Sequence, residues 1–334
     1  MSIASDSLSL AFGFDFGDLY DRASLAQLDQ TFLDYLKAAD AALCERLLAT
    51  RENPQSLARK EASELIIAVA PYLEDFIGEL FGIQTEVRNL QARHNALAPL
   101  YTVKRKFIQR AKAVTSIPRE QSMTFDGEAL AANLETFFEC PFTELAYARA
   151  VDRWLQSEAD YKTQLDLAAR YAAWSTTTPA GQQKHKKGVL FQVAHKIDPY
   201  HLVPVETLLD NGVPKLQLHS DHYRHREGFK LTDAGMDLTG ALDEAHYCIK
   251  CHNQGKDSCS TGLREKTGEY KHSIFGVTLA GCPIEEKISE MNVVKQDGNA
   301  IGALGIVTID NPMCAGTGHR ICNDCMKSCI FQKQ

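Results

Sequence analysis

Cys248-Ile-Lys-Cys251 begins a cysteine-rich segment that closes with Cys322-Asn-Asp-Cys325-Met-Lys-Ser-Cys329. In a C-x-x-C pair the two intervening residues form a tight turn, which brings both thiolates to one metal centre. Eight of the ten cysteines belong to this segment. They are Cys248, Cys251, Cys259, Cys282, Cys314, Cys322, Cys325 and Cys329. Two such pairs with four further thiols are enough for two complete sites, so the segment predicts a metal-binding domain.

The composition sets the class of protein. A chain of 334 residues with a formal net charge of −7 is long enough for one large or two ordinary domains, and nothing in it favours nucleic acid or an anionic membrane as a partner. Its longest apolar runs, such as residues 65–71, are too short to span a bilayer. The first residues resemble neither a secretory signal nor a transit peptide. We therefore expect a cytoplasmic protein, in which clustered thiols stay reduced and bind metal.

The first half of the chain has the periodicity of helices. Apolar residues recur at three- and four-residue steps through roughly residues 20–175, beginning with the stripe Leu25, Leu28, Phe32, Leu36, Leu43 and Leu47. Pro71 is expected to kink or split a second helix. A third is predicted over Val87–Ala113, with a basic face that we expect to be solvated. That face consists of Lys104, Arg105, Lys106 and Arg110.

The pattern predicts three parts: a helical domain at 1–180, a connector with short strands at 181–239, and a metal-binding domain at 240–334. The polar stretch at residues 176–188 contains Pro179 and Gly188 and ends the helical pattern. Lys215–His219 alternates like a strand. Nearby, His219, His222 and His225 would share one face of a helix and bind metal, but a solvated loop is the better interpretation of such charged surroundings.

Two cysteines stand apart from the cysteine-rich segment. Cys44 lies on the apolar side of the first helix, and Cys140 precedes Pro141. We expect both to be small buried apolar side chains rather than ligands.

The order of the other eight follows a known rule for two-cluster proteins. In the bacterial run C-x2-C-x2-C-x3-C-P, the cysteine before proline ligates the other cluster. Here the intervals are longer, and Cys282-Pro283 follows an insertion at 260–281. The rule assigns Cys248, Cys251 and Cys259 to one cluster and Cys282 to the second. Pro283 is also expected to begin a helix that runs through Met291.

Taken together, these motifs resemble the N-terminal iron–sulfur domain of the glutamate synthase small subunit, which dihydropyrimidine dehydrogenase shares. The resemblance covers about residues 240–334 and rests on the first C-x-x-C, Cys282-Pro283-Ile284, Asn311-Pro312 and the tail from Gly318 to Cys329. It implies an α-helical ferredoxin fold with two [4Fe–4S] clusters. In that family the fold is joined to a domain that binds FAD and NAD(P)H.

The resemblance also implies the ligands of each cluster. The first cluster takes Cys248, Cys251, Cys259 and Cys329. The second takes Cys282, Cys322 and Cys325, with a fourth ligand that is Cys314, Gln332, Gln334 or a residue beyond this chain. His246, His252 and His319 lie beside these cysteines, and we expect them to support the ligands or lie on the surface.

Zinc is the competing interpretation. Two structural zinc sites, each with four cysteines, would use the same thiolates and make the chain a zinc-stapled interaction module without redox activity. The Cys-Pro and the interleaved order favour iron–sulfur clusters, because zinc ribbons need neither. Disulfides are the least favoured of the three in a reducing compartment.

The chain lacks a motif for a dinucleotide. Gly298, Gly302 and Gly305 have the wrong spacing for the Gly-rich turn, and we expect them to pack beside a cluster. Hydride chemistry would therefore belong to a flavin domain or partner subunit. The sequence predicts a one-electron relay that couples a FAD- and NAD(P)H-dependent oxidoreductase module to another redox centre, with no catalytic residue of its own in this chain.

Overall fold

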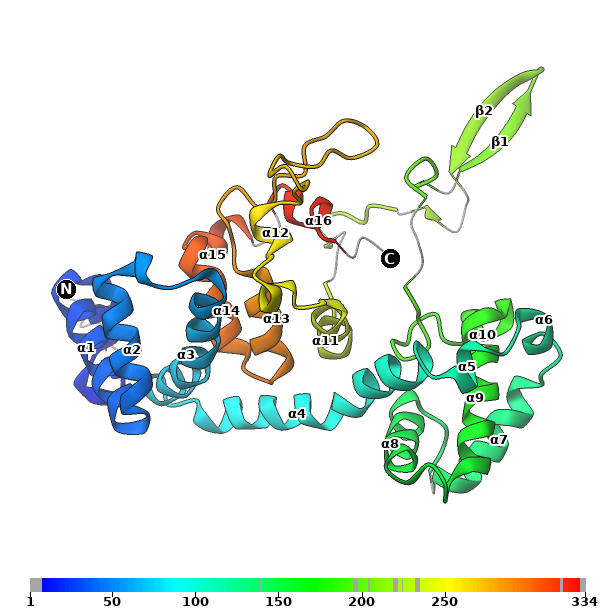
Figure 1. The fold of residues 1–334 in the computed structure, drawn as a ribbon, viewed down its shortest axis with the longest axis horizontal. Coiled ribbons are helices and arrows are strands. Elements are labelled where there is room, and N and C mark those ends of the chain that lie inside the picture. The colour runs from blue at the N-terminus through cyan, green and yellow to red at the C-terminus, as the bar shows by residue number, and fades with distance from the viewer. Residues whose placement is uncertain are drawn as a thin grey trace.

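The computed structural model describes residues 8–138, 140–194, 198–203, 205–218, 222–223, 225–231, 235–318 and 321–330. Within these ranges the protein is mainly helical, as predicted, and its one sheet is a two-stranded hairpin (Figure 1). The helices form an N-terminal bundle, a group from the middle of the sequence (the central group, at the right of Figure 1) and a C-terminal group. A long helix links the first two.

The N-terminal bundle consists of α1 (Arg22–Ala39), α2 (Ala41–Glu52) and α3 (Arg59–Leu80). The predicted first stripe is divided between α1 and α2 because Asp40 caps the second helix, its Oδ1 accepting from the Leu43 N–H at 2.9 Å. Helix α3 runs through Pro71 without being split. The core of the bundle contains Phe32, Leu33, Leu36, Leu43, Cys44, Leu65 and Phe76.

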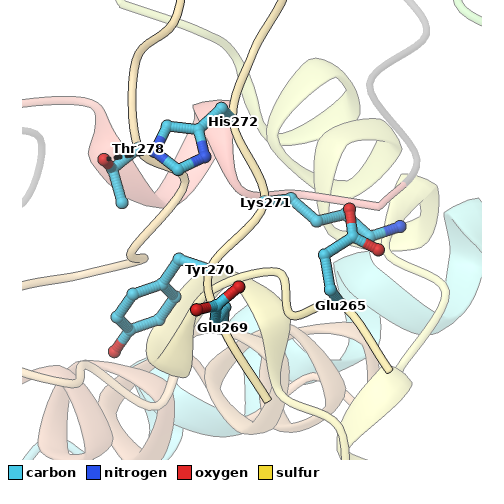
Figure 2. Close-up of a pocket in the computed structure, with 6 residues that line it drawn as sticks. All are labelled: Glu265, Glu269, Tyr270, Lys271, His272 and Thr278. Atoms are coloured by element: carbon cyan, nitrogen blue, oxygen red, sulfur yellow. Dashed lines mark hydrogen bonds between the residues drawn. The ribbon is translucent and has the colours of Figure 1, made fainter. Parts of the chain in front are cut away.

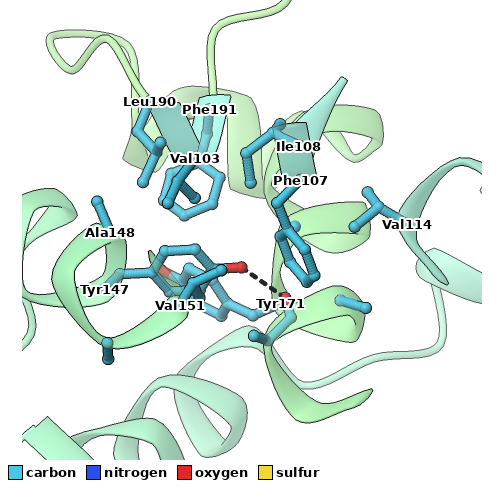
Figure 3. Packing of buried hydrophobic residues seen from close by; sticks show 14 of the residues in the cluster. Val103, Phe107, Ile108, Val114, Tyr147, Ala148, Val151, Tyr171, Leu190 and Phe191 are labelled. Atoms are coloured by element: carbon cyan, nitrogen blue, oxygen red, sulfur yellow. Dashed lines mark hydrogen bonds between the residues drawn. The ribbon is translucent and has the colours of Figure 1, made fainter. Parts of the chain in front are cut away.

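Helix α4 (Gln84–Val103) leads from this bundle to the central group (Figure 1). It passes into a π-helical turn at Lys104–Ile108. The central group follows as α5 (Lys112–Thr115), α6 (Arg119–Ser122), α7 (Gly127–Phe138), α8 (Glu144–Trp154), α9 (Lys162–Thr177) and α10 (Pro179–Lys184). Figure 3 shows its core, where Tyr147 and Tyr171 lie among Val103, Phe107, Val151 and Phe191.

Buried polar contacts fix the end of the central group. Glu144 Oε2 accepts from the N–H groups of Val189 and Leu190 at 2.8 and 2.9 Å, while Oε1 lies 3.1 Å from His185 Nδ1. The other ring nitrogen of His185 lies 2.9 Å from Tyr171 Oη. Residues 185–190 are therefore held against α8 and α9 by one carboxylate and one imidazole.

The hairpin pairs β1 (Val205–Asp210) with β2 (Val213–Leu218) and projects away from the helices (Figure 1). It contains the strand predicted near Lys215. Because side chains alternate across a strand, Leu208 and Val213 lie on one face, while the other collects most of the apolar residues of both strands. That face carries Val205, Thr207, Leu209, Pro214, Leu216 and Leu218. Leu209 and Leu216 are 76% and 73% exposed, so no described residue covers this face.

The C-terminal group consists of α11 (Leu238–Tyr247), α12 (Ser258–Thr261), α13 (Ile288–Gln296), α14 (Ala300–Asp310), α15 (Cys314–Thr317) and α16 (Asp324–Lys327). The predicted helix from Pro283 begins five residues later, at Ile288, because Glu285 has a φ of +52° that a helix excludes.

Helix α11 contacts the end of α4. The ring of His246 stacks on Tyr101 at a centroid distance of 4.4 Å, and Tyr101 Oη donates to the Thr239 carbonyl at 2.8 Å. Lys104 Nζ lies 2.7 Å from Asp243 Oδ2, and its side chain is only 13% exposed. The prediction of a fully solvated basic face is therefore wrong for Lys104, which pairs with a carboxylate on a helix far along the chain.

The N-terminal bundle and the C-terminal group share a core. Helices α13 and α14 pack on α3, where Ala70 is buried together with Val294, Ala303 and Ile306. A Cβ at Gly302 would lie 2.7 Å from the Ala70 carbonyl oxygen.

The glycines that were expected to pack beside a cluster thus serve a different purpose. Gly302 and Gly305 let α14 approach α3 closely, and a Cβ at Gly305 would lie 2.9 Å from Leu73 Cδ2. The predicted domain 1–180 contains two large cores and a small one formed by Leu10, Phe14 and Leu80, and its helix α3 also shares a core with residues 288–310.

Candidate metal centre

The first C-x-x-C loop follows directly on α11. Lys250 has a left-handed backbone, with φ of +56°, which turns its N–H toward the preceding cysteine. That N–H donates to Cys248 Sγ at 3.4 Å. Such N–H···S bonds stabilise negative charge on sulfur, so this loop is already shaped to hold a thiolate.

Cys248, Cys251 and Cys259 form the first thiol group. Burial raises the pKa of the Cys259 thiol far above its usual range, and the negative charges of Asp257, Cys251 and Cys248 raise it further. Burial likewise raises the pKa of Cys251, with Asp257 and Cys248 adding to it. Burial and the neighbouring negative charges therefore both oppose ionisation of these two thiols.

Cys282, Cys322 and Cys325 form the second thiol group. Burial raises the pKa of the Cys325 thiol, and the charges of Cys282 and Cys322 raise it further. The second C-x-x-C loop also contains a left-handed residue, Asn323, with φ of +62°. Cys322 is exposed, whereas Cys282 and Cys325 are half-buried.

The two thiol groups meet at a tight junction. The Cys282 N–H donates to the Cys259 carbonyl at 2.9 Å, and the Gly281 N–H donates to Ser328 Oγ at 2.9 Å. Gly281 has φ of +84°, and a Cβ there would lie 2.5 Å from Gly262 N. The junction therefore requires glycine, and it binds one cysteine of each group to the other through the backbone.

The remaining candidate ligands lie near this junction or outside the described residues. Cys329 follows Ser328 in sequence, and Cys314 begins α15; both are half-buried. Gln332, Gln334, His219 and His319 lie outside the described ranges, while His222 and His225 are exposed.

The two separate cysteines differ from each other. Cys44 is buried, and its thiol donates to the Leu33 carbonyl at 3.4 Å, as expected of a packed side chain. Cys140 is exposed, so the prediction that it is buried is wrong. The residue before proline there lies in a surface turn between α7 and α8, outside both cores.

Buried polar residues surround the first thiol group. His252 and Ser289 are 3% and 0% exposed, and Ser289 Oγ lies 2.5 Å from His252 Nδ1 and 3.7 Å from Cys248 Sγ. Burial, with the charge of Glu290, raises the pKa of Asp257 to about 6. Ser289 was not identified from the sequence; its only signal was its place in the first turn of a helix after Cys-Pro.

As the side chains stand, the described residues contain no group of three or more His, Cys, Asp or Glu that could hold a metal ion. In the first group, for example, the Cys259 thiol donates to Asp257 Oδ1 at 3.3 Å. A backbone hydrogen bond joins Cys282 of the second group to Cys259 of the first, but the side chains as placed do not form a metal site among the described residues.

The insertion between Cys259 and Cys282 is a folded loop. Leu263, Lys271 and Leu279 are joined by backbone hydrogen bonds of 2.8 to 2.9 Å. The loop carries an open cavity of about 520 Å³ lined by Glu265, Glu269, Tyr270, Lys271, His272 and Thr278 (Figure 2). This cavity has no cysteine in its lining and is separate from both thiol groups.

Among the described helices, none has the length and apolar character needed to cross a membrane.

Comparison with known proteins places the chain in a family. Residues 10–82 match the model of the RP005 N-terminal alpha-helical domain. The chain is 33% identical over 302 residues to "Uncharacterized protein RP005" of Rickettsia prowazekii (strain Madrid E), covering 86% of this chain and 98% of that protein. The chain belongs to the RP005 family. No solved structure matches it.

Membership of the RP005 family corrects the resemblance drawn from the cysteine motifs. The identification with the iron–sulfur domain of the glutamate synthase small subunit is wrong, since the matches are to the RP005 family and not to a ferredoxin or glutamate synthase family. The motifs that suggested it are local: a C-x-x-C turn, a Cys-Pro and short helices occur wherever thiolates gather, whatever the family. Any proposal of metal binding therefore rests on the arrangement of the cysteines in this chain.

Proposed function

We propose that the C-terminal group of helices holds two [4Fe–4S] clusters and relays single electrons. The observation that supports this most is the junction, where two groups of three thiols are joined by the Cys282 to Cys259 hydrogen bond. Two structural zinc sites would not need to lie side by side. The two clusters of an electron relay must, because electrons pass between clusters only when these are close.

The donor set suits such clusters. Cys248, Cys251 and Cys259 would hold the first cluster, with Cys329 as its fourth ligand. Cys282, Cys322 and Cys325 would hold the second, with a fourth ligand from Cys314, Gln332 or Gln334, or from a residue beyond this chain. When bound, each cluster supplies a one-electron redox centre.

The environment of the two groups suggests a direction through the relay. The first group lies beside buried residues, with Cys251 only 7% exposed, whereas Cys322 of the second group is exposed. The second cluster would therefore be the one that meets an external redox partner. In functional terms, residues 240–334 would act as a ferredoxin-like module.

Clusters take single electrons, whereas nicotinamides exchange hydride, so a relay that is supplied by a nicotinamide would need a flavin between the two. We infer a partner domain or subunit that binds FAD and NAD(P)H, in the cytoplasm, where the thiols stay reduced before the clusters form.

The test is the metal content of the chain purified without oxygen. We expect about eight iron and eight acid-labile sulfide per chain, as two four-iron clusters require. Cys251→Ala and Cys325→Ala should each remove about half of the iron, because each belongs to one cluster only. Cys140→Ala, an exposed thiol outside both groups, is the matched control and should leave the iron unchanged.

The zinc interpretation gives the opposite result. About two zinc per chain without sulfide, as two four-cysteine sites require, would overturn the electron relay and make the protein a stapled interaction module. Full iron in both the Cys251 and the Cys325 variant would show that the clusters are held elsewhere.

A further inference from the structure

Ser289 is a fully buried serine whose hydroxyl lies beside Cys248, a candidate ligand of the first thiol group. Its Oγ lies 3.7 Å from Cys248 Sγ and 2.5 Å from His252 Nδ1. Ser289 is fully buried and His252 is 3% exposed, so water does not compete for the contact between them.

The direction of these hydrogen bonds follows from the state of the cysteine. A cysteine that ligates metal is a thiolate and only accepts, so the Ser289 hydroxyl must donate to Cys248 Sγ. The oxygen of Ser289 then accepts from His252 Nδ1–H, which fixes the tautomer of that imidazole. The imidazole of His252 thus donates to Ser289, and Ser289 donates to the sulfur. The first hydrogen bond polarises the hydroxyl and strengthens the second.

The N-terminal bundle holds Ser289 in place. The neighbouring residue, Glu290, is 1% exposed, and its Oε1 accepts from Ser63 Oγ of α3 at 2.5 Å. Helix α13 also packs along α3, which fixes the first turn on which Ser289 lies. The hydroxyl is therefore aimed by a rigid contact between helices far apart in sequence.

We propose that Ser289 is a positioning residue that raises the reduction potential of the first cluster through its hydrogen bond to Cys248. A hydrogen bond to a cluster sulfur stabilises the added electron, which makes reduction easier. The described residues give Cys282, Cys322 and Cys325 no side-chain hydroxyl contact of this kind. This inference rests on the proposed electron relay and adds a residue that adjusts the potential of its first centre.

The experiment is a redox titration of the anaerobic full chain, followed by electron paramagnetic resonance, together with iron and sulfide analysis. Ser289→Ala should keep both clusters and shift one of the two reduction steps to a more negative potential. Ser289→Thr retains the hydroxyl and should restore the potential of the wild-type chain.

A second pair of variants keeps the test independent of any damage at position 289. His252→Asn places an amide N–H near the position of Nδ1 and should preserve the chain of donors. His252→Leu fills similar space without a donor and should shift the same reduction step in the same direction as Ser289→Ala.

Two results would overturn the inference, and they differ in what else they affect. Iron and sulfide in the wild-type chain, with both potentials unchanged in Ser289→Ala and His252→Leu, would overturn the role of Ser289 alone. A wild-type chain without iron would overturn the electron relay and this inference together.

Discussion

The carboxylate of Glu74 on α3 accepts the backbone N–H of Gly302 on α14 at 3.0 Å, across 228 positions of sequence. The same oxygen, Oε2, accepts the Ile301 N–H at 2.8 Å, and Gln91 donates to Oε1 at 3.1 Å. Glu74 is 1% exposed, so it caps the start of α14 inside the protein. This contact joins the bundle that matches the RP005 N-terminal alpha-helical domain to the C-terminal group of helices.

Glu74→Ala should therefore be strongly destabilising. It leaves the N–H groups of Ile301 and Gly302 buried without acceptors, and we expect a loss of about 3 kcal/mol in the free energy of unfolding. Urea denaturation followed by circular dichroism measures it. Asp75→Ala, at the exposed neighbouring position, should change the stability by less than about 0.5 kcal/mol. Equal effects in the two variants would show that the cap contributes nothing particular.

Gly302→Ala tests the close approach of α14 to α3. The new Cβ would lie 2.7 Å from the Ala70 carbonyl oxygen, which is backbone and cannot rotate away. We expect a loss of about 1–3 kcal/mol by overpacking. Gly316→Ala in α15 adds the same methyl where no atom lies within 4 Å and should be nearly neutral. A stable Gly302→Ala protein would mean that the two helices can move apart freely.

Gly281→Ala tests the junction of the two thiol groups. Its Cβ would meet Gly262 N at 2.5 Å and force the two backbone segments apart. We expect loss of most of the bound metal, measured as metal per chain.

The control for this variant is Gly276→Ala. Gly276 also has a positive φ, +73°, but its Cβ would meet nothing within 4 Å, so this variant carries only the backbone cost of about 1–2 kcal/mol. Metal should be retained there. Equal loss of metal in both variants would assign the effect to backbone strain instead of to the junction.

The stability of the central helices should depend on Glu144 at acid pH. Burial opposes its ionisation, but the hydrogen bonds from His185, Leu190 and Val189 outweigh burial and lower the pKa of Glu144 below its usual 4.5. Because the folded-state pKa is the lower one, the stabilisation is complete above the unfolded-state pKa and is lost as the pH falls through the folded-state value.

Glu144→Gln should accordingly reduce the stability at neutral pH and flatten its fall below about pH 4.5, the usual range for glutamate. Thermal unfolding at a series of pH values measures both effects. Glu128→Gln, whose side chain is 79% exposed, should follow the wild-type curve. A Glu144→Gln curve parallel to that of the wild type would contradict the assignment.

The sequence predicted the helical class and the strand near Lys215 because both depend on local periodicity. It did not predict that the first stripe breaks at Asp40, although the capping aspartate was visible there. It also placed the glycines of α14 beside a cluster, since nothing local records that α3 would pack on them. The grouping of cysteines by spacing was accessible, whereas Ser289 and Glu74 act through partners more than thirty positions away and have no local signature.

Helix α3 can pack on α14 only after both have been synthesised on the ribosome, so this contact forms with a delay. At roughly 5–20 residues per second, Gly302 emerges on the order of ten seconds or more after Glu74, 228 positions earlier. Throughout that interval the nascent bundle carries a buried-type carboxylate and the apolar face around Ala70 in contact with water. Helix α3 therefore lacks its packing partner α14 until that helix has been synthesised.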